Sequence, residues 1–190
     1  MKVGLYFGTY NPIHIGHLAI AGYMLEYSEI DQLWFVVTPQ NPFKERSSLL
    51  PDYQRLDLVY RAVEKHENMR VSDIEFGLEK PSYTANTLAH LKEKHPDHEF
   101  YLIMGADNLA TFHKWRNYEF ILENYKILVY PRLAQINQPL MEHKNIQQID
   151  APIMQIASTF IRKAIKEGKD VSYFLPPEVA AYIDEMNFYR

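Results

Sequence analysis

Four short apolar runs separated by helical patterns limit the possible folds of this chain more than any other feature. The runs are Val3 to Gly8, Leu33 to Thr38, Phe100 to Met104 and Ile127 to Tyr130. Runs of this length that are rich in aliphatic and aromatic residues are typical of strands covered on both faces. Because helical segments connect them, the strands are expected to run parallel. The sequence therefore predicts an α/β domain with a doubly wound, Rossmann-like, mostly parallel sheet and helices on both of its faces.

The helical segments are recognised by apolar residues three or four positions apart and by their end signals. Pro51 suits the first turn of one helix, and Gly168 is a stop signal for another. The expected helices are Ile13 to Tyr27, the segment that begins near Pro51, Thr84 to Lys94, Ser158 to Lys166 and Pro177 to Met186. A further short strand is expected at Val71 to Ile74. The polar stretch from Arg132 to Asp150 is interpreted as a loop.

Length and composition limit the remaining possibilities. A chain of 190 residues can bury about 70% of its unfolded surface, and no linker divides it, so we expect one domain, with an α/β core at about 1–155 and closing helices at about 156–190. A formal charge of −4 argues against a general nucleic-acid partner but leaves small anions open. The absence of cysteine excludes disulfides and thiolate chemistry. Without a signal-peptide core or a run of ~20 apolar residues, we expect a cytoplasmic protein and no membrane partner.

The first strand-to-helix turn lacks both common phosphate-binding fingerprints, GxGxxG and GxxxxGK[ST]. In their place stands the stretch from Gly8 to His17. Gly8 and Gly16 let a ligand approach the backbone, and the amides at the start of the next helix face the same space. His14 and His17 lie three residues apart, so both can point toward an anion held there. Capping or zinc ligation are alternatives, although zinc needs a third ligand.

Two stretches of the sequence resemble the motifs of a known family. The letters GTYNPIHIGH at 8–17 resemble the HxGH signature of the nucleotidylyltransferase superfamily, and Ile156 to Arg162 is similar to its ISxTxIR motif. The resemblance implies transfer of a nucleoside monophosphate from a triphosphate to a phosphate-bearing acceptor. Ser158 suits a helix N-cap and Arg162 lies one turn further along, so this motif can form a second triphosphate clamp. The residues expected to bind ATP are Gly8, Thr9, His14, Gly16, His17, Ile156, Ser158, Thr159 and Arg162, of which His14, His17 and Arg162 are the expected catalytic residues.

Three further stretches resemble the bacterial nicotinate-nucleotide adenylyltransferase family. They are 81–88, which begins PSYT, 105–115, which runs from Gly105 through Asp107 to Trp115, and the end of the chain from Leu175 to Arg190. The family's reaction joins ATP and nicotinate mononucleotide to give nicotinate adenine dinucleotide and pyrophosphate in NAD biosynthesis. One departure is visible, because Tyr10 and Asn11 replace the more usual Phe and Asp.

The resemblance also implies a role for each acceptor-side residue. Thr84, beside Tyr83, would bind the nicotinate carboxylate, and Trp115 would stack on the pyridine ring. Asp107, after Gly105, would accept hydrogen bonds from ribose hydroxyls. The phosphate would be contacted by Lys44 and Arg132, whereas Arg46 and Arg55 are interpreted as solvated. Mg²⁺ is implied as a cofactor carried by ligand oxygens, with no metal-binding protein side chain.

Two alternatives remain open at this level. The acceptor could be nicotinamide mononucleotide, which differs from the acid only by its amide, although the PSYT element favours the acid. The pocket could also belong to a nucleotide sensor without turnover, which the presence of both clamps argues against. A homo-oligomer is compatible with the sequence.

Overall fold

Six strands form a single parallel sheet in the order β3-β2-β1-β4-β5-β6. This computed structural model describes residues 1–39, 49–133 and 139–190. The strands are β1 (Lys2–Gly8), β2 (Gln32–Val37), β3 (Met69–Ser72), β4 (Glu99–Gly105), β5 (Lys126–Tyr130) and β6 (Ile146–Gln148). The order confirms the predicted doubly wound sheet.

The centre of the sheet positions the functional loops. β1 lies between β2 and β4, with Leu5 opposite Trp34 on one side and Leu102 on the other. The chain winds away from β1 in both directions, so the strand order reverses between β1 and β4. In sheets of this kind ligands bind at the carboxyl ends of the strands where the order reverses. The loops that follow Gly8 and Gly105 therefore lie at the expected binding crevice.

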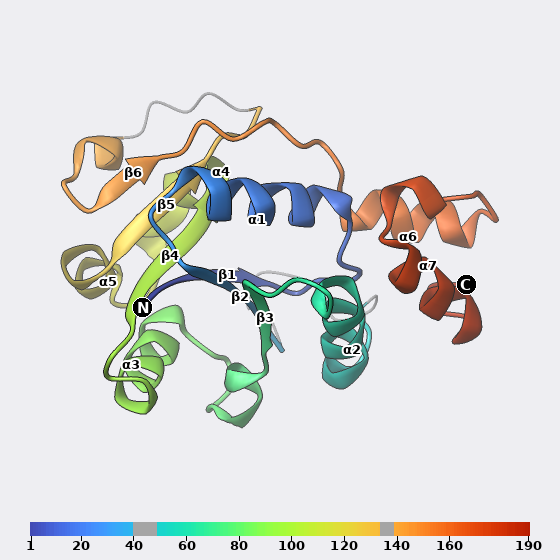
Figure 1. The fold of residues 1–190 in the computed structure, drawn as a ribbon, viewed down its shortest axis with the longest axis horizontal. Coiled ribbons are helices and arrows are strands. Elements are labelled where there is room, and N and C mark those ends of the chain that lie inside the picture. The colour runs from blue at the N-terminus through green and yellow to red at the C-terminus, as the bar shows by residue number, and fades with distance from the viewer. Residues whose placement is uncertain (40–48, 134–138) are drawn as a thin grey trace.

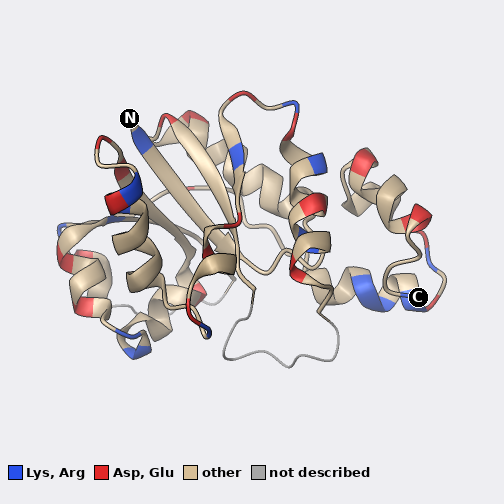
Figure 2. Cartoon of the chain, turned by 90° about the horizontal axis from the view of Figure 1, so that it is seen from below, with Lys and Arg blue, Asp and Glu red and all other residues tan. Residues whose placement is uncertain are grey.

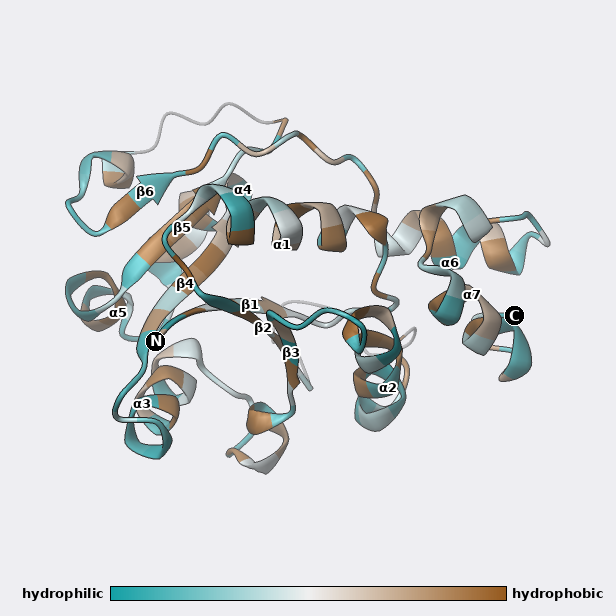
Figure 3. Ribbon diagram, viewed as in Figure 1, coloured by the Kyte–Doolittle hydropathy of each residue, from teal (hydrophilic) through white to brown (hydrophobic). Residues whose placement is uncertain are grey.

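Helices cover both faces of the sheet (Figure 1). They are α1 (Ile15–Tyr27), α2 (Asp52–Val63), α3 (Thr84–Lys94), α4 (Ala106–Thr111), α5 (Tyr118–Asn124), α6 (Ser158–Lys166) and α7 (Pro177–Glu185). Buried residues of α1, α2, α6 and α7 form one apolar cluster with the sheet, and those of α3, α4 and α5 form a second cluster on the opposite face. The strands between these layers are largely apolar (Figure 3).

Several element boundaries differ from the sequence prediction. The stretch interpreted as a loop contains a short helical turn at Pro139–Glu142 and the edge strand β6. Only Ile146 of β6 is buried, and the two glutamines are exposed. An edge strand with a single inward residue has no apolar run to reveal it. α1 begins at Ile15, two residues later than expected, because His14 has an extended backbone.

Charged residues lie mostly on helices and connecting loops, while the strands are nearly free of them (Figure 2). Acidic and basic segments are interspersed around the molecule. In the described ranges no helix combines the length and the apolar character that crossing a bilayer requires.

Candidate functional site

The loop after β1 has a tightly constrained backbone. Tyr10 adopts a positive φ of 44°, and the Asn11–Pro12 peptide bond is cis. The Tyr10 ring folds back over the end of β1 and its hydroxyl donates a hydrogen bond to the Tyr6 carbonyl at 2.5 Å. A Cβ atom on Gly8 would lie 2.8 Å from this ring, closer than van der Waals contact allows. Gly8 is therefore required by the packing of the loop itself.

His14 and His17 lie at the start of α1 and stack on each other. Their ring centroids are 3.7 Å apart at an interplanar angle of 25°, and the His17 ring packs edge-on against Tyr10 at 5.1 Å. The His14 backbone N–H donates to His17 Nδ1 at 3.2 Å, so a neutral His17 carries its proton on Nε2. A Cβ atom on Gly16 would lie 3.1 Å from His14 Nδ1. The glycine of the H-x-G-H spacing thus makes room for the first histidine.

Burial makes His14 a neutral group. The residue is only 4% exposed, and its burial, together with the positive charge of Arg132, lowers the pKa of His14 to about 4. Its Nδ1 atom is buried and has no hydrogen-bond partner among the described residues. A buried polar atom without a partner costs free energy. An anion bound beside His14 would supply a partner and favour the protonated form.

The first turn of α6 docks directly on this loop. Ser158 Oγ donates to the Pro12 carbonyl at 2.9 Å, and Arg162 Nη1 donates to the Asn11 carbonyl at 2.8 Å. Ile156 approaches Gly16 so closely that a Cβ atom on the glycine would lie 3.5 Å from the Ile156 side chain. The two sequence motifs, more than 140 residues apart, are therefore brought together.

One prediction about α6 is wrong. Ser158 is the first helical residue, and Ala157 occupies the N-cap position without a side-chain cap. The Ser158 hydroxyl is used for the contact with Pro12 instead. Thr159, in the same first turn, is exposed, so a ligand can reach it.

Asp107 and Arg132 face each other at the carboxyl ends of β4 and β5. Asp107 lies in the first turn of α4, and its Oδ1 atom is 3.6 Å from Arg132 Nε. Arg132 Nη1 also donates to the Met154 carbonyl at 3.2 Å. A Cβ atom on Gly105 would collide with the Asp107 carboxylate. Because Arg132 also acts on the pKa of His14, this pair borders the histidine site.

Two further predicted segments meet at the start of α3. Tyr83 is the N-cap residue of α3, and Thr84 is its first helical residue. The Arg116 guanidinium lies 4.8 Å from the centre of the Tyr83 ring, within the range of a cation–π contact. Trp115, next to it, is half-buried and packs edge-on against Phe112 at 5.3 Å. Lys44 and Arg46, which are also among the sequence-based predictions, lie outside the described residues.

The interpretation of Arg55 as a solvated residue is wrong. Arg55 is fully buried, and its guanidinium donates to the carbonyls of Thr9 at 2.7 Å, Thr38 at 2.8 Å and Leu50 at 2.9 Å. It also pairs with Asp52 at 2.7 Å. These bonds replace the water that a charged group loses on burial.

A spacing signal for Arg55 is present in the sequence. The buried residues of α2 are Arg55, Leu58, Val59, Ala62 and Val63. Their separations of three and four place Arg55 on the inward stripe of the helix. An arginine on the buried face of a helix is unusual. Residue type alone therefore predicts that Arg55 is exposed to solvent.

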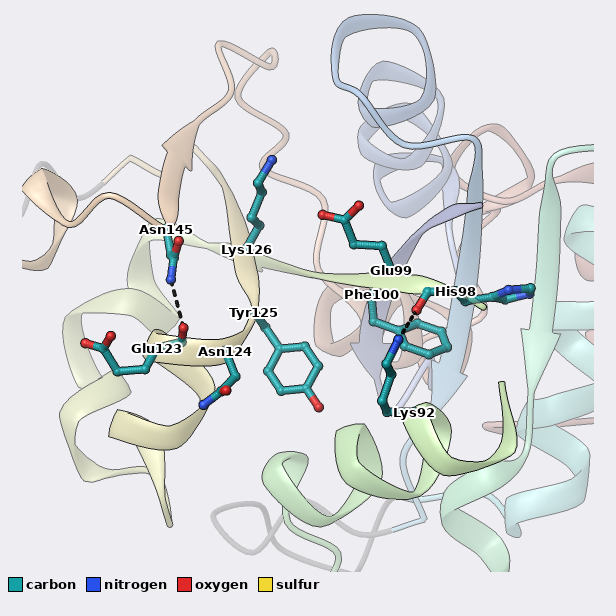
Figure 4. Close-up of a pocket in the computed structure, with 9 residues that line it drawn as sticks. All are labelled: Lys92, His98, Glu99, Phe100, Glu123, Asn124, Tyr125, Lys126 and Asn145. Carbon is teal, nitrogen blue, oxygen red and sulfur yellow. Dashed lines mark hydrogen bonds between the residues drawn. The ribbon is translucent and has the colours of Figure 1, made fainter. Parts of the chain in front are cut away.

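A cavity of about 280 Å³ lies elsewhere, at the amino ends of β4 and β5 (Figure 4). Its lining residues are Lys92, His98, Glu99, Phe100, Glu123, Asn124, Tyr125, Lys126 and Asn145. None of these belongs to the predicted site, which is at the opposite, carboxyl end of the strands. The cavity is therefore separate from the crevice described above.

Comparisons with known proteins agree with these observations. The sequence profile of the cytidylyltransferase-like family matches residues 5–164. A curated relative from Flavobacterium johnsoniae, named "Probable nicotinate-nucleotide adenylyltransferase", is 60% identical over 192 aligned positions that cover 100% of both chains. A relative of the same name from Flavobacterium psychrophilum is 57% identical and also covers 100% of both chains.

Solved structures share the fold at much lower sequence identity. The Plasmodium falciparum nicotinic acid mononucleotide adenylyltransferase complexed with NaAD has a TM-score of 0.83 at 19% identity, covering 99% of this chain and 97% of that one. The same protein complexed with APC has a TM-score of 0.83 at 20% identity, covering 99% and 96%. At these identities the likeness shows the fold.

Proposed function

The chain belongs to the cytidylyltransferase-like family and, within it, to the nicotinate-nucleotide adenylyltransferases, and we propose that its crevice transfers AMP from ATP to nicotinate mononucleotide. The observation that carries the proposal is the docking of the Ser158–Arg162 turn on the segment at 9–17 after β1, which we call the histidine loop. This contact supports the proposal because the two segments proposed to bind the triphosphate lie side by side at the carboxyl ends of the strands.

The reaction requires positioning and charge stabilisation more than acid–base chemistry. An oxygen of the acceptor phosphate attacks the α-phosphorus of ATP, a new P–O bond forms, and the bond to the bridging oxygen breaks to release pyrophosphate. The second pKa of a phosphate monoester is about 6, so the nucleophile is already ionised near neutral pH. Proximity and electrostatic stabilisation then supply most of the rate enhancement.

The histidine pair is proposed to bind the α-phosphate. His17 offers Nε2–H as a donor when it is neutral, because its Nδ1 accepts the His14 amide. His14, with its pKa lowered to about 4 in the ligand-free protein, becomes more basic beside a phosphate. The charge that develops on the departing pyrophosphate is then met by donors that are already in place.

The start of α6 is proposed to hold the β- and γ-phosphates. Amides in the first turn of a helix have no partners within the helix and attract anions. Thr159 adds an exposed side chain with a hydroxyl, and the Arg162 guanidinium lies at the Asn11 carbonyl beside the same loop. Its planar fork suits phosphate oxygens.

On the acceptor side, Tyr83 and Thr84 are proposed to bind the nicotinate carboxylate and Trp115 to stack on the pyridine ring. Asp107 would accept hydrogen bonds from ribose hydroxyls, with Arg132 and Lys44 near the acceptor phosphate. The Arg116 contact with Tyr83 supports a shared pocket for the two segments.

Mg²⁺ is proposed to enter with the triphosphate. Over the described parts of the chain, no group of three or more His, Asp or Glu side chains is arranged to hold a metal ion. The nearby side chains His14, His17 and Arg162 suit phosphate oxygens better than a cation. A hard cation of this kind is commonly bound by phosphates and water, and it neutralises part of the triphosphate charge.

Pyrophosphate release tests the proposal. Purified protein with ATP, Mg²⁺ and nicotinate mononucleotide should release pyrophosphate, and the His17→Ala variant should lose about 10²–10³-fold in kcat, the usual cost of removing one oxyanion donor. His66→Ala is the matched control, since His66 is exposed and lies before the amino end of β3, whereas the histidine loop follows the carboxyl end of β1. A higher kcat/KM with nicotinamide mononucleotide than with the acid would contradict the acceptor assignment.

A further inference from the structure

Glu75 is a buried carboxylate for which the reaction described above has no use. It lies in a short 3₁₀ helix at Ile74–Gly77 and is 2% exposed. Its Oε1 atom accepts a hydrogen bond from Thr87 Oγ1 at 2.7 Å, and its Oε2 atom accepts one from Ser82 Oγ at 3.1 Å. The Thr38 side chain is a third hydrogen-bond donor. Three hydroxyls from separate segments therefore converge on one carboxyl group.

Burying a carboxylate costs free energy unless hydrogen bonds offset the loss of water. Burial raises the pKa of Glu75, and the hydroxyl donors only partly oppose this effect. An apolar residue in the same place would avoid the cost of removing a carboxylate from water. The hydroxyls compensate this cost and, in doing so, fix the positions of the segments that carry them.

The segments held by Glu75 enclose the proposed acceptor-binding residues. Ser82 directly precedes Tyr83, and Thr87 Oγ1 lies 3.3 Å from the Tyr83 carbonyl as well. The start of α3 has no side-chain cap of its own. The carboxylate instead bonds the side chains of Ser82, before the helix start, and Thr87, in its first turn, and so limits where Tyr83 and Thr84 lie.

The third donor, Thr38, connects this turn to the histidine loop. Thr38 follows β2, and its carbonyl accepts a hydrogen bond from Arg55 at 2.8 Å. The same Arg55 nitrogen donates to the Thr9 carbonyl at 2.7 Å. A continuous polar chain thus runs from Glu75 through Thr38 and Arg55 to Thr9. Reacting atoms must approach to about 3–3.5 Å in line, so the relative placement of the two substrates depends on such links.

We propose that Glu75 is a positioning residue for the acceptor, holding the Ser82–Thr87 turn so that Tyr83 and Thr84 receive the pyridine carboxylate. The inference rests on the proposed function, since it assigns these two residues to the acceptor. Glu75 itself touches neither substrate.

Steady-state kinetics of Glu75→Gln test this role. The amide keeps the shape of the side chain but replaces one acceptor oxygen with a donor. We expect the KM for nicotinate mononucleotide to rise about tenfold, while the KM for ATP stays within twofold of wild type. Equal rises in both KM values, or no rise for the acceptor, would overturn the proposal. Wild-type protein that releases no pyrophosphate would instead refute the proposed function itself.

Two control variants separate positioning from general stability. Leu88→Ala removes a fully buried side chain from α3 without touching the carboxylate, so it should lower the melting temperature and leave both KM values unchanged. Glu99→Gln alters a carboxylate that also accepts a hydroxyl, from Tyr101 at 3.0 Å, but at the amino end of β4. It should behave as wild type in both KM values. If Glu75→Gln, like Leu88→Ala, lowers the melting temperature and leaves both KM values unchanged, Glu75 has a structural role only.

The donor side gives an independent test, which also applies if Glu75→Gln fails to fold. Ser82→Ala should raise the KM for nicotinate mononucleotide at least threefold, whereas Ser28→Ala, which removes a hydroxyl bonded to the Met24 carbonyl at the end of α1, should not. Ser82→Ala in the Glu75→Gln background should add nothing further. Independent effects of the two substitutions would contradict a shared role.

Discussion

In the histidine loop, the side chain of Asn11 acts as a hydrogen-bond acceptor for two distant segments. Asn11 stands where the motif that the sequence resembles more often has Asp, so a negative charge is missing there. Its Oδ1 atom accepts hydrogen bonds from the Leu50 amide at 3.2 Å and from the Tyr189 hydroxyl at 2.8 Å. An amide oxygen accepts such bonds as a carboxylate oxygen does. These two contacts therefore need an acceptor at position 11 and do not need a negative charge.

His14 gives a prediction about pH at the same scale. Its pKa of about 4 in the folded protein lies below its ordinary value of 6.5, so the unfolded chain binds the proton more readily. Stability is then lost as the pH falls from about 6.5 to 4. Between pH 7 and 4.5 the free energy of unfolding of His14→Asn should fall by about 2–3 kcal/mol less than that of wild type. Urea denaturation at both pH values measures this difference, and parallel pH profiles would contradict it.

At the scale of elements, the end of the chain completes the first loop. Tyr189, which follows α7 and has a positive φ of 66°, reaches back to Asn11, while α6 contacts Asn11 and Pro12 as well. Burial raises the pKa of Tyr189, so its hydroxyl keeps the proton that it donates. The histidine loop is thus held in place by the closing helices as well as by the sheet.

Removing this terminal contact should destabilise the protein measurably. Tyr189→Phe keeps the ring and deletes only the hydroxyl, so the free energy of unfolding should fall by about 1 kcal/mol, the typical net value of one hydrogen bond. Tyr173→Phe is the matched control, because Tyr173 is 87% exposed. Equal denaturation midpoints for the two variants would show that the Tyr189 hydroxyl adds nothing.

For the whole molecule, most of the apolar core and the candidate site lie in different places. The core lies on both faces of the sheet, whereas the candidate site occupies the loops at the carboxyl ends of the strands. A formal charge of −4 is compatible with the proposed triphosphate binding, because the guanidinium groups of Arg132 and Arg162 both lie beside the histidine loop. Positive potential at a site depends on such local arrangement more than on net charge.

A core truncation far from the loops should therefore separate stability from catalysis. Leu33, fully buried near the amino end of β2, is a suitable position. Leu33→Ala should lower the free energy of unfolding by about 2–5 kcal/mol and leave kcat within twofold at a temperature where the variant is folded. Leu33→Met, which conserves volume, should cost less than about 1.5 kcal/mol. A large loss of kcat in folded Leu33→Ala would show that core and site are coupled.

The fold class, the family and most of the candidate site follow from the order of amino acids alone. Apolar runs such as Leu33 to Thr38 and Phe100 to Met104 identify buried parallel strands because both of their faces must be apolar. The histidine loop and the Ser158–Arg162 turn are contiguous motifs, so their residues can be identified without coordinates. The predicted bounds of α3, Thr84–Lys94, are confirmed, because its ends and its apolar spacing are local.

Which polar groups are buried, and what they contact, depends instead on the packing of the folded chain. Arg55 and Glu75 are of residue types that usually lie on the protein surface. Their roles depend on carbonyls and hydroxyls from segments distant in sequence. The hydroxyl of Ser158 bonds to Pro12 instead of capping its own helix, a choice set by the packing of α6 on the first loop. Local sequence determines periodicity and backbone preference, whereas the partners of a buried polar atom are determined by which distant segments the fold brings within about 3 Å.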